Sequence, residues 1–502
     1  AKEGTDPEQV VRLEVDRQTA ADLSVRNLIT SMRLISSFEW QQFVEAVSLV
    51  HEALNAAPVF ASMDFITRDR YRHAVEQLAR RSPLTEIEVA QAVVARAAAA
   101  DHAADARTRD PGYYLIDEGR AGFEREIDYD VPLLRRLHRA ALRIALPLYL
   151  GLVFALTFGL LALVLSSGSP NVEPVYLALL GVLAFFPASD IAVTLVNRLV
   201  GRVVAPRHLP RLKLSDGIPP SMRTFVVVPT LLGSDESIAE QVHQLETRYL
   251  SSGPGELFFA LLTDWSDADS EHLPGDDAQY DFAVAAIRKL NSRYPAAGDG
   301  AAAGRPRFYL FHRRRLWNAS QGRWMGWERK RGKLQEFNRL LRGAQDTSFI
   351  RDAHFEAPPV GVRFVLTLDA DTILPIGTAT ELVGTLVHPL NRPRLDSSQR
   401  VVQGYGILQP RITPALPTRV SGTRFQQLFS GNAGVDPYTF QVSDINQDLF
   451  AEGTFTGKGL YEVDYFEASL AGRTPENTIL SHDLFEGSFA RCGFVSDVEL
   501  FE

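Results

Sequence analysis

The sequence predicts an α/β domain on a mainly parallel sheet, preceded by an α-helical domain and a pair of membrane-spanning helices. Residues 1–130 carry apolar side chains at three- and four-residue spacing, which is typical of amphipathic helices. Two long apolar runs follow within residues 144–196. From residue 214 to residue 502, short β-branched runs alternate with longer helical stretches, which indicates an α/β sheet. A chain of 502 residues is also too long for one compact core.

The composition narrows the classes of protein. The chain is 45% hydrophobic and 23% charged, as in ordinary globular proteins, and its net charge of -9 argues against a nucleic-acid binder. The single cysteine, Cys492, permits no intrachain disulfide and indicates a reducing compartment. The chain starts AKEGTDPEQ, without the features of a signal peptide, and ends SDVELFE, so we expect both ends to be cuts from a longer protein.

Within the first 130 residues, two segments predict helices. The segment 24–54 is amphipathic throughout, and the segment 85–106 is rich in alanine. An aromatic and charged stretch, 63–81, joins them. No catalytic constellation is visible here, so we expect a cytoplasmic domain with a packing or regulatory role.

The apolar runs 144–165 and 175–196 predict two transmembrane helices. The first has 22 residues and no charge, and a bilayer core of roughly 30 Å needs about 20 such residues. The second contains Pro187 and Asp190. A buried core helix is the alternative for each run. The short, turn-rich loop SSGSPNVEP between them favours a helical hairpin.

Basic residues flank the two runs and predict their orientation. The connecting loop has no Lys or Arg, whereas nine basic residues lie just outside the pair: Arg135, Arg136, Arg139, Arg143, Arg198, Arg202, Arg207, Arg211 and Lys213. By the positive-inside rule, the segments before and after the pair are both cytoplasmic.

Polar residues recur where the predicted strands end. The expected strands are 224–232, 256–264, 307–314, 363–371 and 401–410. In parallel sheets the ligand lies beyond the carboxyl ends of the strands. Pro229 and Thr230 end the first strand, Asp264 ends the second, and Asp369 and Asp371 end the fourth.

The segment LTLDADT places Asp369 and Asp371 two residues apart as a buried strand opens into a loop. Two such carboxylates can bind Mg²⁺ or Mn²⁺, either together or through one acid and a water. The cation would neutralise the charge on a departing diphosphate. The rival motif is the D-x-D-x-T of phosphatases, but here Ile373 occupies the Thr position.

Downstream, Asp483 follows a Ser-His pair and precedes a helix-like stretch. A sugar-transfer base must lie within hydrogen-bond reach of an acceptor hydroxyl, and Asp483 fits this need, with His482 orienting it or touching the sugar. A plain helix cap is an equally good explanation of Asp483.

Two further segments have the composition of a sugar-nucleotide site. The segment 450–466 contains Gly457 and Lys458, and its three glycines suit either close backbone approach to a ligand or a simple turn. A basic, Trp-rich segment lies upstream of the D-x-D. Its indoles can stack on glucose and its cations can hold phosphate, although a solvated basic face is the alternative. The residues are Trp317, Trp324, Trp327, Lys330, Arg331 and Lys333.

These segments together resemble the inverting GT-A glycosyltransferases, whose fold is a Rossmann-like mixed sheet. In that pattern an early Asp contacts uracil, a G-K segment precedes a metal-binding D-x-D, and a later Asp is the base. The matching positions are Asp264, Gly332-Lys333, Asp369/Asp371 and Asp483. The Q-x-x-R-W motif of cellulose synthases does not follow Asp483.

The chain also resembles the cyclic β-1,2-glucan synthases over nearly its whole length. The strings that carry this resemblance are VRNLITSMRLISSFEWQQFVE, MDFITRDRYRHAVEQLARRS, GYYLIDEGR, WMGWERKRGKLQEFNRLL, TLDADTILP and ENTILSHDLFEGSFARCGFVSDVELFE. The resemblance implies a multi-pass protein of the bacterial inner membrane that transfers glucose from UDP-glucose, with inversion, to a β-1,2-glucan acceptor. It also implies a divalent metal, contact with membrane lipids, separate cyclising and phosphorylase-like regions of the same polypeptide, and a primer tyrosine that we cannot assign.

Two other functions remain open at this point. One is a synthase of the same fold that makes a different β-glycan. The other is a non-catalytic membrane sensor that binds a sugar nucleotide. The intact set of Asp264, Asp369, Asp371 and Asp483 argues against the sensor, since function must be argued from the site and not from the fold.

Overall fold

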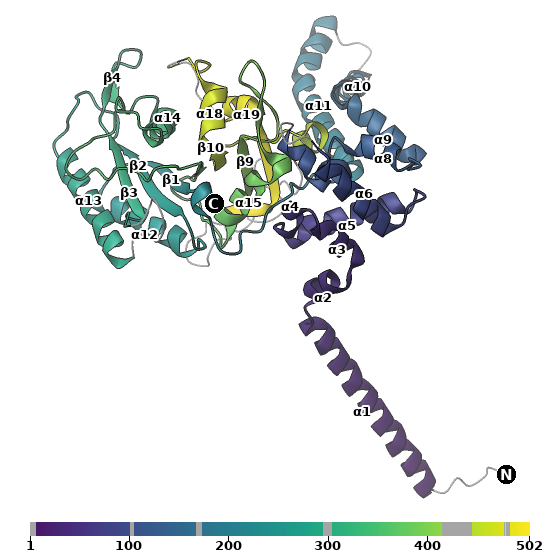
Figure 1. Cartoon of the computed structure of the whole chain (residues 1–502). Coiled ribbons are helices and arrows are strands. Elements are labelled where there is room, and N and C mark those ends of the chain that lie inside the picture. Colours follow the sequence, from purple (N-terminus) through teal and green to yellow (C-terminus); the bar gives the residue numbers. More distant parts are fainter. Residues whose placement is uncertain are drawn as a thin grey trace.

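The computed structural model describes residues 7–100, 105–166, 173–294, 304–413, 444–475, 477 and 482–502. Three parts are visible in Figure 1: a helical N-terminal part, two long helices beside it, and a large sheet covered by helices. The N-terminal helix α1 (Pro7–Ser37) extends away from all of them.

The N-terminal part is helical, as predicted. Its elements after α1 are α2 (Trp40–Val47), α3 (Leu49–Asn55), α4 (Pro58–Ala61), α5 (Phe65–Ala79), α6 (Glu86–Ala98), η1 (Ala106–Arg109), α7 (Pro111–Ile116), α8 (Arg120–Glu126) and α9 (Leu133–Arg143). The prediction of one helix over 24–54 is wrong, because three helices share this segment. Ser48 is extended and its side chain accepts a hydrogen bond from the His51 N–H, so it ends α2 and caps α3.

Helices α10 (Ala145–Ser166) and α11 (Pro174–Val203) correspond to the two predicted spans. By length and composition, both are able to cross a membrane. They contact each other, and the Tyr149 hydroxyl donates to Asn197 Oδ1 at 2.8 Å. Residues 167–172 of the predicted hairpin loop lie outside the described residues. Helix α11 continues seven residues beyond the predicted end of its span.

The large sheet has seven strands in the order β11-β9-β10-β6-β1-β2-β3. The strands are β1 (Thr224–Leu231), β2 (Leu257–Asp264), β3 (Phe308–Arg313), β6 (Phe364–Thr367), β9 (Ile407–Thr413), β10 (Gly459–Glu462) and β11 (Cys492–Phe501). Among these seven, β10 is antiparallel to both of its neighbours, and the other pairs are parallel. The sheet is therefore mixed.

Both faces of this sheet are buried under helices, which explains why its strands read as continuous apolar runs. One face packs against α12 (Asp235–Leu250), α13 (Asp276–Arg293) and α15 (Thr378–Val387). The other packs against α14 (Arg329–Leu341), α18 (Val463–Leu470) and α19 (Asp483–Ala490). Alternate residues of β1 belong to the two cores, with Val226 in the first and Phe225 in the second.

The predicted strand 401–410 is two strands. β8 (Val401–Gln403) pairs with β7 (Arg394–Leu395) in a separate small sheet, and β9 joins the large one. The chain turns between them at Gly404, which has a φ of +64°, and a Cβ there would collide with the Arg392 carbonyl. Only glycine adopts this conformation readily, so the run cannot continue straight.

The helical part docks on the sheet part through the segment after α11. Backbone hydrogen bonds join Lys213 N to Ser62 O at 2.8 Å and Asp64 N to Arg211 O at 3.1 Å. On its other side the segment bonds the sheet part, since Leu212 N donates to Gly384 O at 3.0 Å. The Arg211 guanidinium adds ion pairs to Asp64, Glu381 and Asp497.

Candidate active site

The direction in which successive strands are added to the sheet reverses at β1 and β6. From β1 it proceeds outward to β2 and β3, then returns to place β6 on the opposite side of β1. The carboxyl ends of strands at such a switch point form the usual ligand crevice of open α/β sheets. Thr230 lies at the end of β1 and Asp369 follows β6, so both predicted residues lie at this edge.

The loop that carries Asp369 and Asp371 is held by Arg248 of α12. The Arg248 guanidinium donates to the carbonyl oxygens of Asp369, Ala370 and Thr372 at 2.8–3.1 Å. Arg248 is only 3% exposed, and burial lowers its pKa to about 10, an effect that the nearby carboxylates oppose. It therefore remains charged and fixes the backbone of the D-A-D turn.

Asp369 and Asp371 have different surroundings. Asp369 Oδ1 lies 2.6 Å from Lys330 Nζ, and Oδ2 lies 3.2 Å from Lys458 Nζ. Burial alone would raise the pKa of Asp369, but the two ammonium groups outweigh burial and lower it. Asp371 is exposed at the mouth of the loop. Asp371 is thus the carboxylate most open to a ligand.

The reversed strand β10 explains how Lys458 reaches Asp369. Gly459 pairs with Thr367, so the residues just before β10 lie beside those just after β6. Gly457 and Lys458 therefore occupy the same edge as the D-A-D turn, as the site prediction requires. Lys330 Nζ also donates to the Gly457 carbonyl at 3.3 Å, which ties α14 to this segment.

Asp483 lies against the same glycine. A Cβ built on Gly457 would be 2.7 Å from Asp483 Oδ1, so the backbone approaches the carboxylate as closely as glycine allows. Helix α19 begins at Asp483, with His482 as N-cap and no side-chain capping hydrogen bond. Asp483 Oδ1 is buried and has no hydrogen-bond partner among the described residues. This geometry does not favour the helix-cap interpretation.

His482 lies between two acids. Its Nδ1 is 3.0 Å from Glu486 Oε1 and 3.4 Å from Asp483 Oδ1. Burial would lower the pKa of His482, but Glu486 and Asp483 raise it; burial also raises the pKa of Glu486. The imidazole and the Glu486 carboxylate therefore form a buried pair. The ligand atoms of His482, Asp483 and Glu486 all lie within 4.8 Å of one another, so these three side chains could also hold a metal ion.

Asp264 and Lys333 form a buried cluster at the ends of β2 and β3. Asp264 accepts two hydrogen bonds from Arg313, at 2.7 and 2.9 Å, and lies 3.0 Å from Lys333 Nζ. These cations lower the pKa of Asp264 although burial opposes them. Lys333 also donates to the Thr230 carbonyl, and so connects Asp264 to the end of β1. Asp264 is 3% exposed, which leaves little of its carboxylate for direct contact with a ligand.

Three other predicted residues lie at the edges of this arrangement. The Arg331 guanidinium pairs with Glu328 at 2.9 Å and lies 5.6 Å from the Trp327 ring centroid. Gly332 permits this packing, because a Cβ there would meet Trp327 and Glu328. Pro229 lies within β1, one residue before Thr230. Arg331 is therefore already paired, and Lys330 is the residue of this basic segment that reaches the D-x-D.

The motif reading missed Arg248, Arg313 and Glu486 as parts of the site. Arg248 and Arg313 act through contacts to residues 49–124 positions away, which no local pattern reveals. The sequence does predict a contact between Glu486 and His482, because Glu486 follows His482 by four residues at the start of a helix and so lies on the same face.

No protein-family model matches the chain. A comparison with curated proteins finds cyclic beta-(1,2)-glucan synthase NdvB of Rhizobium meliloti, which is 42% identical over 510 residues, covering 100% of this chain. The chain spans 18% of the length of that relative. The family resemblance predicted from the motifs is thus confirmed: along its whole length, this chain is similar to a region of a cyclic β-1,2-glucan synthase.

Proposed function

We propose that this chain is the glycosyltransferase part of a cyclic β-1,2-glucan synthase, with a GT-A type sheet, and that it transfers glucose from UDP-glucose to a growing β-1,2-glucan. The observation that carries the proposal is the meeting of Asp369, Lys330, Lys458, Gly457 and Asp483 at the switch point of the sheet. The similarity to a glucan synthase supports the substrate class.

UDP would lie across the carboxyl ends of β1, β2 and β6. In this arrangement Asp264 acts near the uracil mainly by fixing Lys333, since its carboxylate is already paired. Burial lowers the pKa of Lys333 to about 8, an effect that Asp264 opposes. Because Lys333 is 3% exposed and bonded to Asp264 and the Thr230 carbonyl, its charge would stabilise the diphosphate through space and not by direct contact. Lys330 and Lys458 add positive charge beside Asp369. Trp327 is proposed to contact the acceptor.

The donor set fits a hard divalent cation, Mg²⁺ or Mn²⁺, through the exposed Asp371. Asp369, already neutralised by two ammonium groups, would support it through the shared turn rather than as the main ligand. When bound, the cation supplies neutralisation of the diphosphate charge. Arg248 holds the turn that presents Asp371, whether or not a ligand is bound.

In the transfer step, Asp483 accepts the proton of the acceptor 2-hydroxyl. The hydroxyl oxygen forms a bond to the anomeric carbon of glucose, and the bond from that carbon to the UDP oxygen breaks with its electron pair leaving on UDP. Attack from the face opposite UDP inverts the configuration. The buried Oδ1 of Asp483 suits this role, because it accepts no hydrogen bond within the described residues and has only the His482 ring beside it, at 3.4 Å. Glu486 in turn holds the His482 ring through a 3.0 Å contact to Nδ1.

Helices α10 and α11 would anchor the site at the bacterial inner membrane, with the helical and sheet parts in the cytoplasm. Their length and hydropathy support this placement, and the basic flanks support the orientation. Further regions of the same polypeptide would cyclise and trim the glucan, since the curated relative is much longer than this chain.

The test is glucose transfer from labelled UDP-glucose by the purified full-length protein, with Mg²⁺ or Mn²⁺, comparing wild type with Asp483→Asn. One positioned base typically contributes about 10²–10⁴-fold, so transfer should fall by that factor while UDP binding persists. A matched control is Asp464→Asn, which removes an exposed carboxylate of α18 whose partner is Arg342. Near-normal transfer by Asp483→Asn would refute the base assignment. Absence of transfer by the wild type would favour a sugar-nucleotide sensor, and linkage analysis of the product would reveal a different β-glycan.

A further inference from the structure

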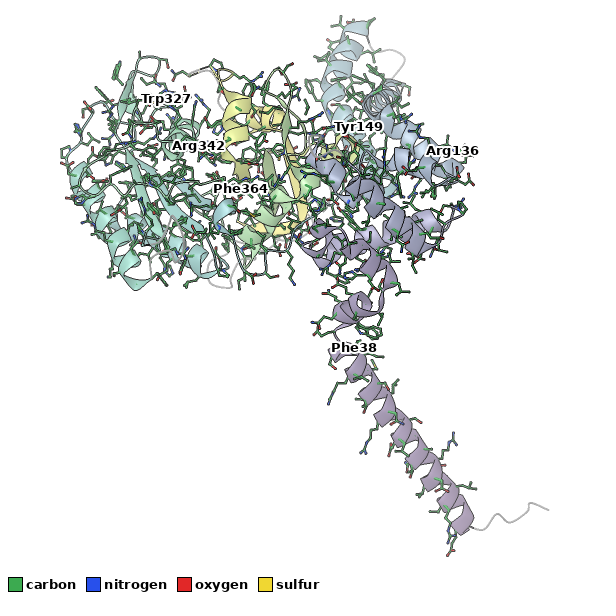
Figure 2. The ribbon with its side chains drawn as sticks, in the orientation of Figure 1. Phe38, Arg136, Tyr149, Trp327, Arg342 and Phe364 are labelled. Atoms are coloured by element: carbon green, nitrogen blue, oxygen red, sulfur yellow. The ribbon has the colours of Figure 1, made fainter. Side chains whose placement is uncertain are left out.

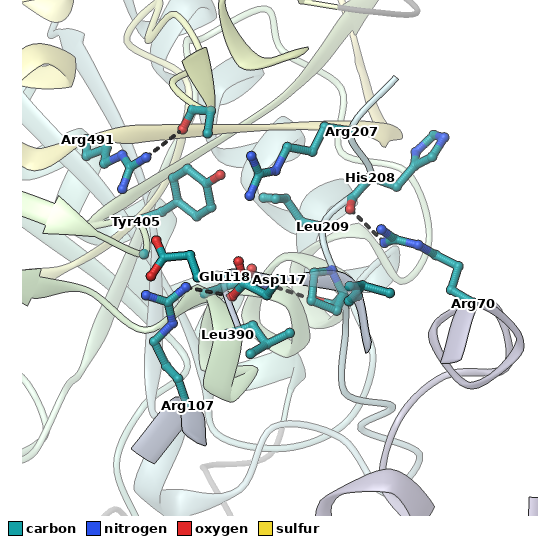
Figure 3. A pocket seen from close by; sticks show the side chains of 15 residues that line it. Arg70, Arg107, Asp117, Glu118, Arg207, His208, Leu209, Leu390, Tyr405 and Arg491 are labelled. Atoms are coloured by element: carbon teal, nitrogen blue, oxygen red, sulfur yellow. Dashed lines mark hydrogen bonds and ion pairs between the residues drawn. The ribbon is translucent and has the colours of Figure 1, made fainter. Parts of the chain in front are cut away.

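A second polar cavity lies between the helical part and the sheet part, away from the candidate active site. Its volume is about 180 Å³, and Figure 3 shows the side chains that line it. Arg70 comes from α5 and Arg107 from η1, whereas Arg491 follows α19. Arg207 comes from the segment after α11. The helical part, the sheet part and the segment that connects α11 to the sheet therefore each contribute at least one arginine to this cavity.

The arginines exceed the acids in this cavity. Four arginines and two carboxylates, Asp117 and Glu118, line the cavity, and Glu452 Oε1 lies 3.6 Å from Arg491 Nε, which leaves an excess of one positive charge. One pair is direct, since Arg107 Nη2 lies 2.6 Å from Asp117 Oδ2. Glu118 instead accepts a hydrogen bond from Gln403 Nε2 at 3.0 Å. The three acids thus do not balance the four cations.

Several guanidinium groups in the cavity also lack acceptors. Arg107 is only 5% exposed, yet its Nε and Nη1 have no hydrogen-bond partner among the described residues. Arg491 Nε makes no hydrogen bond there either, although it lies 3.6 Å from Glu452 Oε1. Arg70 bonds only the His208 carbonyl, at 2.7 Å, among the side-chain hydrogen bonds found in the described part of the chain. Buried N–H donors without acceptors are costly, so a cluster of them around one space indicates a missing acceptor.

We propose that this cavity binds a small phosphate-class anion, either free phosphate or a phosphomonoester, or the headgroup phosphate of a membrane lipid. Guanidinium forks match phosphate oxygens, and a phosphate offers more acceptor oxygens than a single carboxylate to the unpaired N–H groups of Arg107. The volume is below the ~300–1,000 Å³ of sites for drug-sized ligands, which excludes a whole nucleotide. A lipid is a reasonable source, since Arg207 lies four residues after the end of α11.

Such an anion would join the helical part to the sheet part. Arg70 and Arg107 belong to the first and Arg491 to the second, so one ligand contacts both sides of the docking interface. Binding would stabilise the docked arrangement and give the helical part a regulatory input that is separate from the donor site. The proposal does not depend on the transferase activity, because it is tested without donor or acceptor.

The test measures the thermal unfolding of the purified full-length protein in phosphatidylcholine nanodiscs against increasing inorganic phosphate. Arg207→Ala is the main variant, because the Arg207 side chain is exposed and has no hydrogen bond or ion pair within the described part of the chain. Arg202→Ala is the matched control, an exposed arginine in the last turn of α11 that does not line the cavity. Phosphate should raise the melting temperature saturably in wild type and Arg202→Ala, with an affinity about tenfold or more weaker in Arg207→Ala.

A second arm replaces phosphatidylcholine by phosphatidylglycerol and omits phosphate. If the headgroup fills the cavity, wild type and Arg202→Ala are stabilised in these nanodiscs, added phosphate has no further effect, and Arg207→Ala loses the gain. A response in either arm that depends on Arg207 supports the proposal and identifies the source. No stabilisation in either arm, or equal stabilisation of all three proteins, overturns it.

Discussion

Replacing Gly457 by alanine should reduce sugar transfer without abolishing donor binding. Gly457 has a φ of +84°, and an added Cβ would be 2.7 Å from Asp483 Oδ1 and 3.0 Å from its Cγ. The positive φ costs about 1 kcal/mol in stability for a residue with a side chain. The contact then forces the Asp483 carboxylate back by roughly 0.5–1 Å to reach an ordinary separation.

This displacement predicts the size of the effect. A misplacement of about 1 Å at a reacting group can cost about 10²-fold in rate, so Gly457→Ala should lower kcat roughly 10- to 100-fold. UDP binding should change little, because the alanine methyl points at Asp483 and not at the turn of Asp371. The assay is transfer from labelled UDP-glucose, with UDP affinity measured separately on the same preparations.

Gly472→Ala provides the matched control. Gly472 also has a positive φ, of +69°, but a Cβ there meets nothing within 4 Å. The positive φ destabilises both variants, and only Gly457→Ala also displaces Asp483. Equal activities of the two variants would refute the idea that Gly457 positions a catalytic Asp483. A selective loss of UDP affinity in Gly457→Ala would instead assign this glycine to the donor site.

Three other variants have defined outcomes. Arg248→Gln leaves the carbonyls of the D-A-D turn without their guanidinium donor, so denaturant melts should show a free energy of unfolding lower by about 1–3 kcal/mol. In Mg²⁺ titrations, transfer activity should rise less steeply with the Mg²⁺ concentration than in wild type. Asp371→Asn should weaken UDP binding in Mg²⁺ about tenfold or more, and chelation by EDTA should then have no further effect. Burial raises the pKa of Asp110 to about 7, so the contribution of this carboxyl group to the free energy of unfolding is fully present below its unfolded pKa and is lost as the pH rises to about 7. In denaturant melts between pH 5 and pH 8, Asp110→Asn should therefore reduce the dependence of the free energy of unfolding on pH.

The parts of the fold that were predicted well are those with local signals. The expected strands 224–232 and 256–264 agree with β1 and β2 within one residue at each end, because strands buried on both faces are unbroken apolar runs. The D-x-D and Asp483 were found by motif, and the structure places both near Gly457. Their chemical roles remain predictions.

Other features have no local signal. The break at Ser48 depends on one side-chain cap inside an otherwise amphipathic run, and periodicity does not detect it. Arg248 recognises backbone carbonyls 121–124 residues away, so no side-chain pattern identifies its partner. The pairing of Asp264 with Arg313 likewise appears only when β2 and β3 are neighbours. Because of this pairing, the Asp264 carboxylate is buried and supports other side chains of the site, whereas the motif predicts that it contacts the ligand.

The direction of β10 decides whether Lys458 belongs to the site at all. β10 has four residues, and at about 3.3 Å per residue a parallel strand would carry Lys458 to the opposite edge of the sheet, more than about 13 Å from Asp369. A lysine side chain cannot span that distance, so the 3.2 Å contact requires the reversal. A parallel β10 would have left Asp369 with Lys330 alone. The antiparallel direction of β10, within a sheet whose other pairs are parallel, is therefore what brings Gly457 and Lys458 to the edge that carries the D-A-D turn.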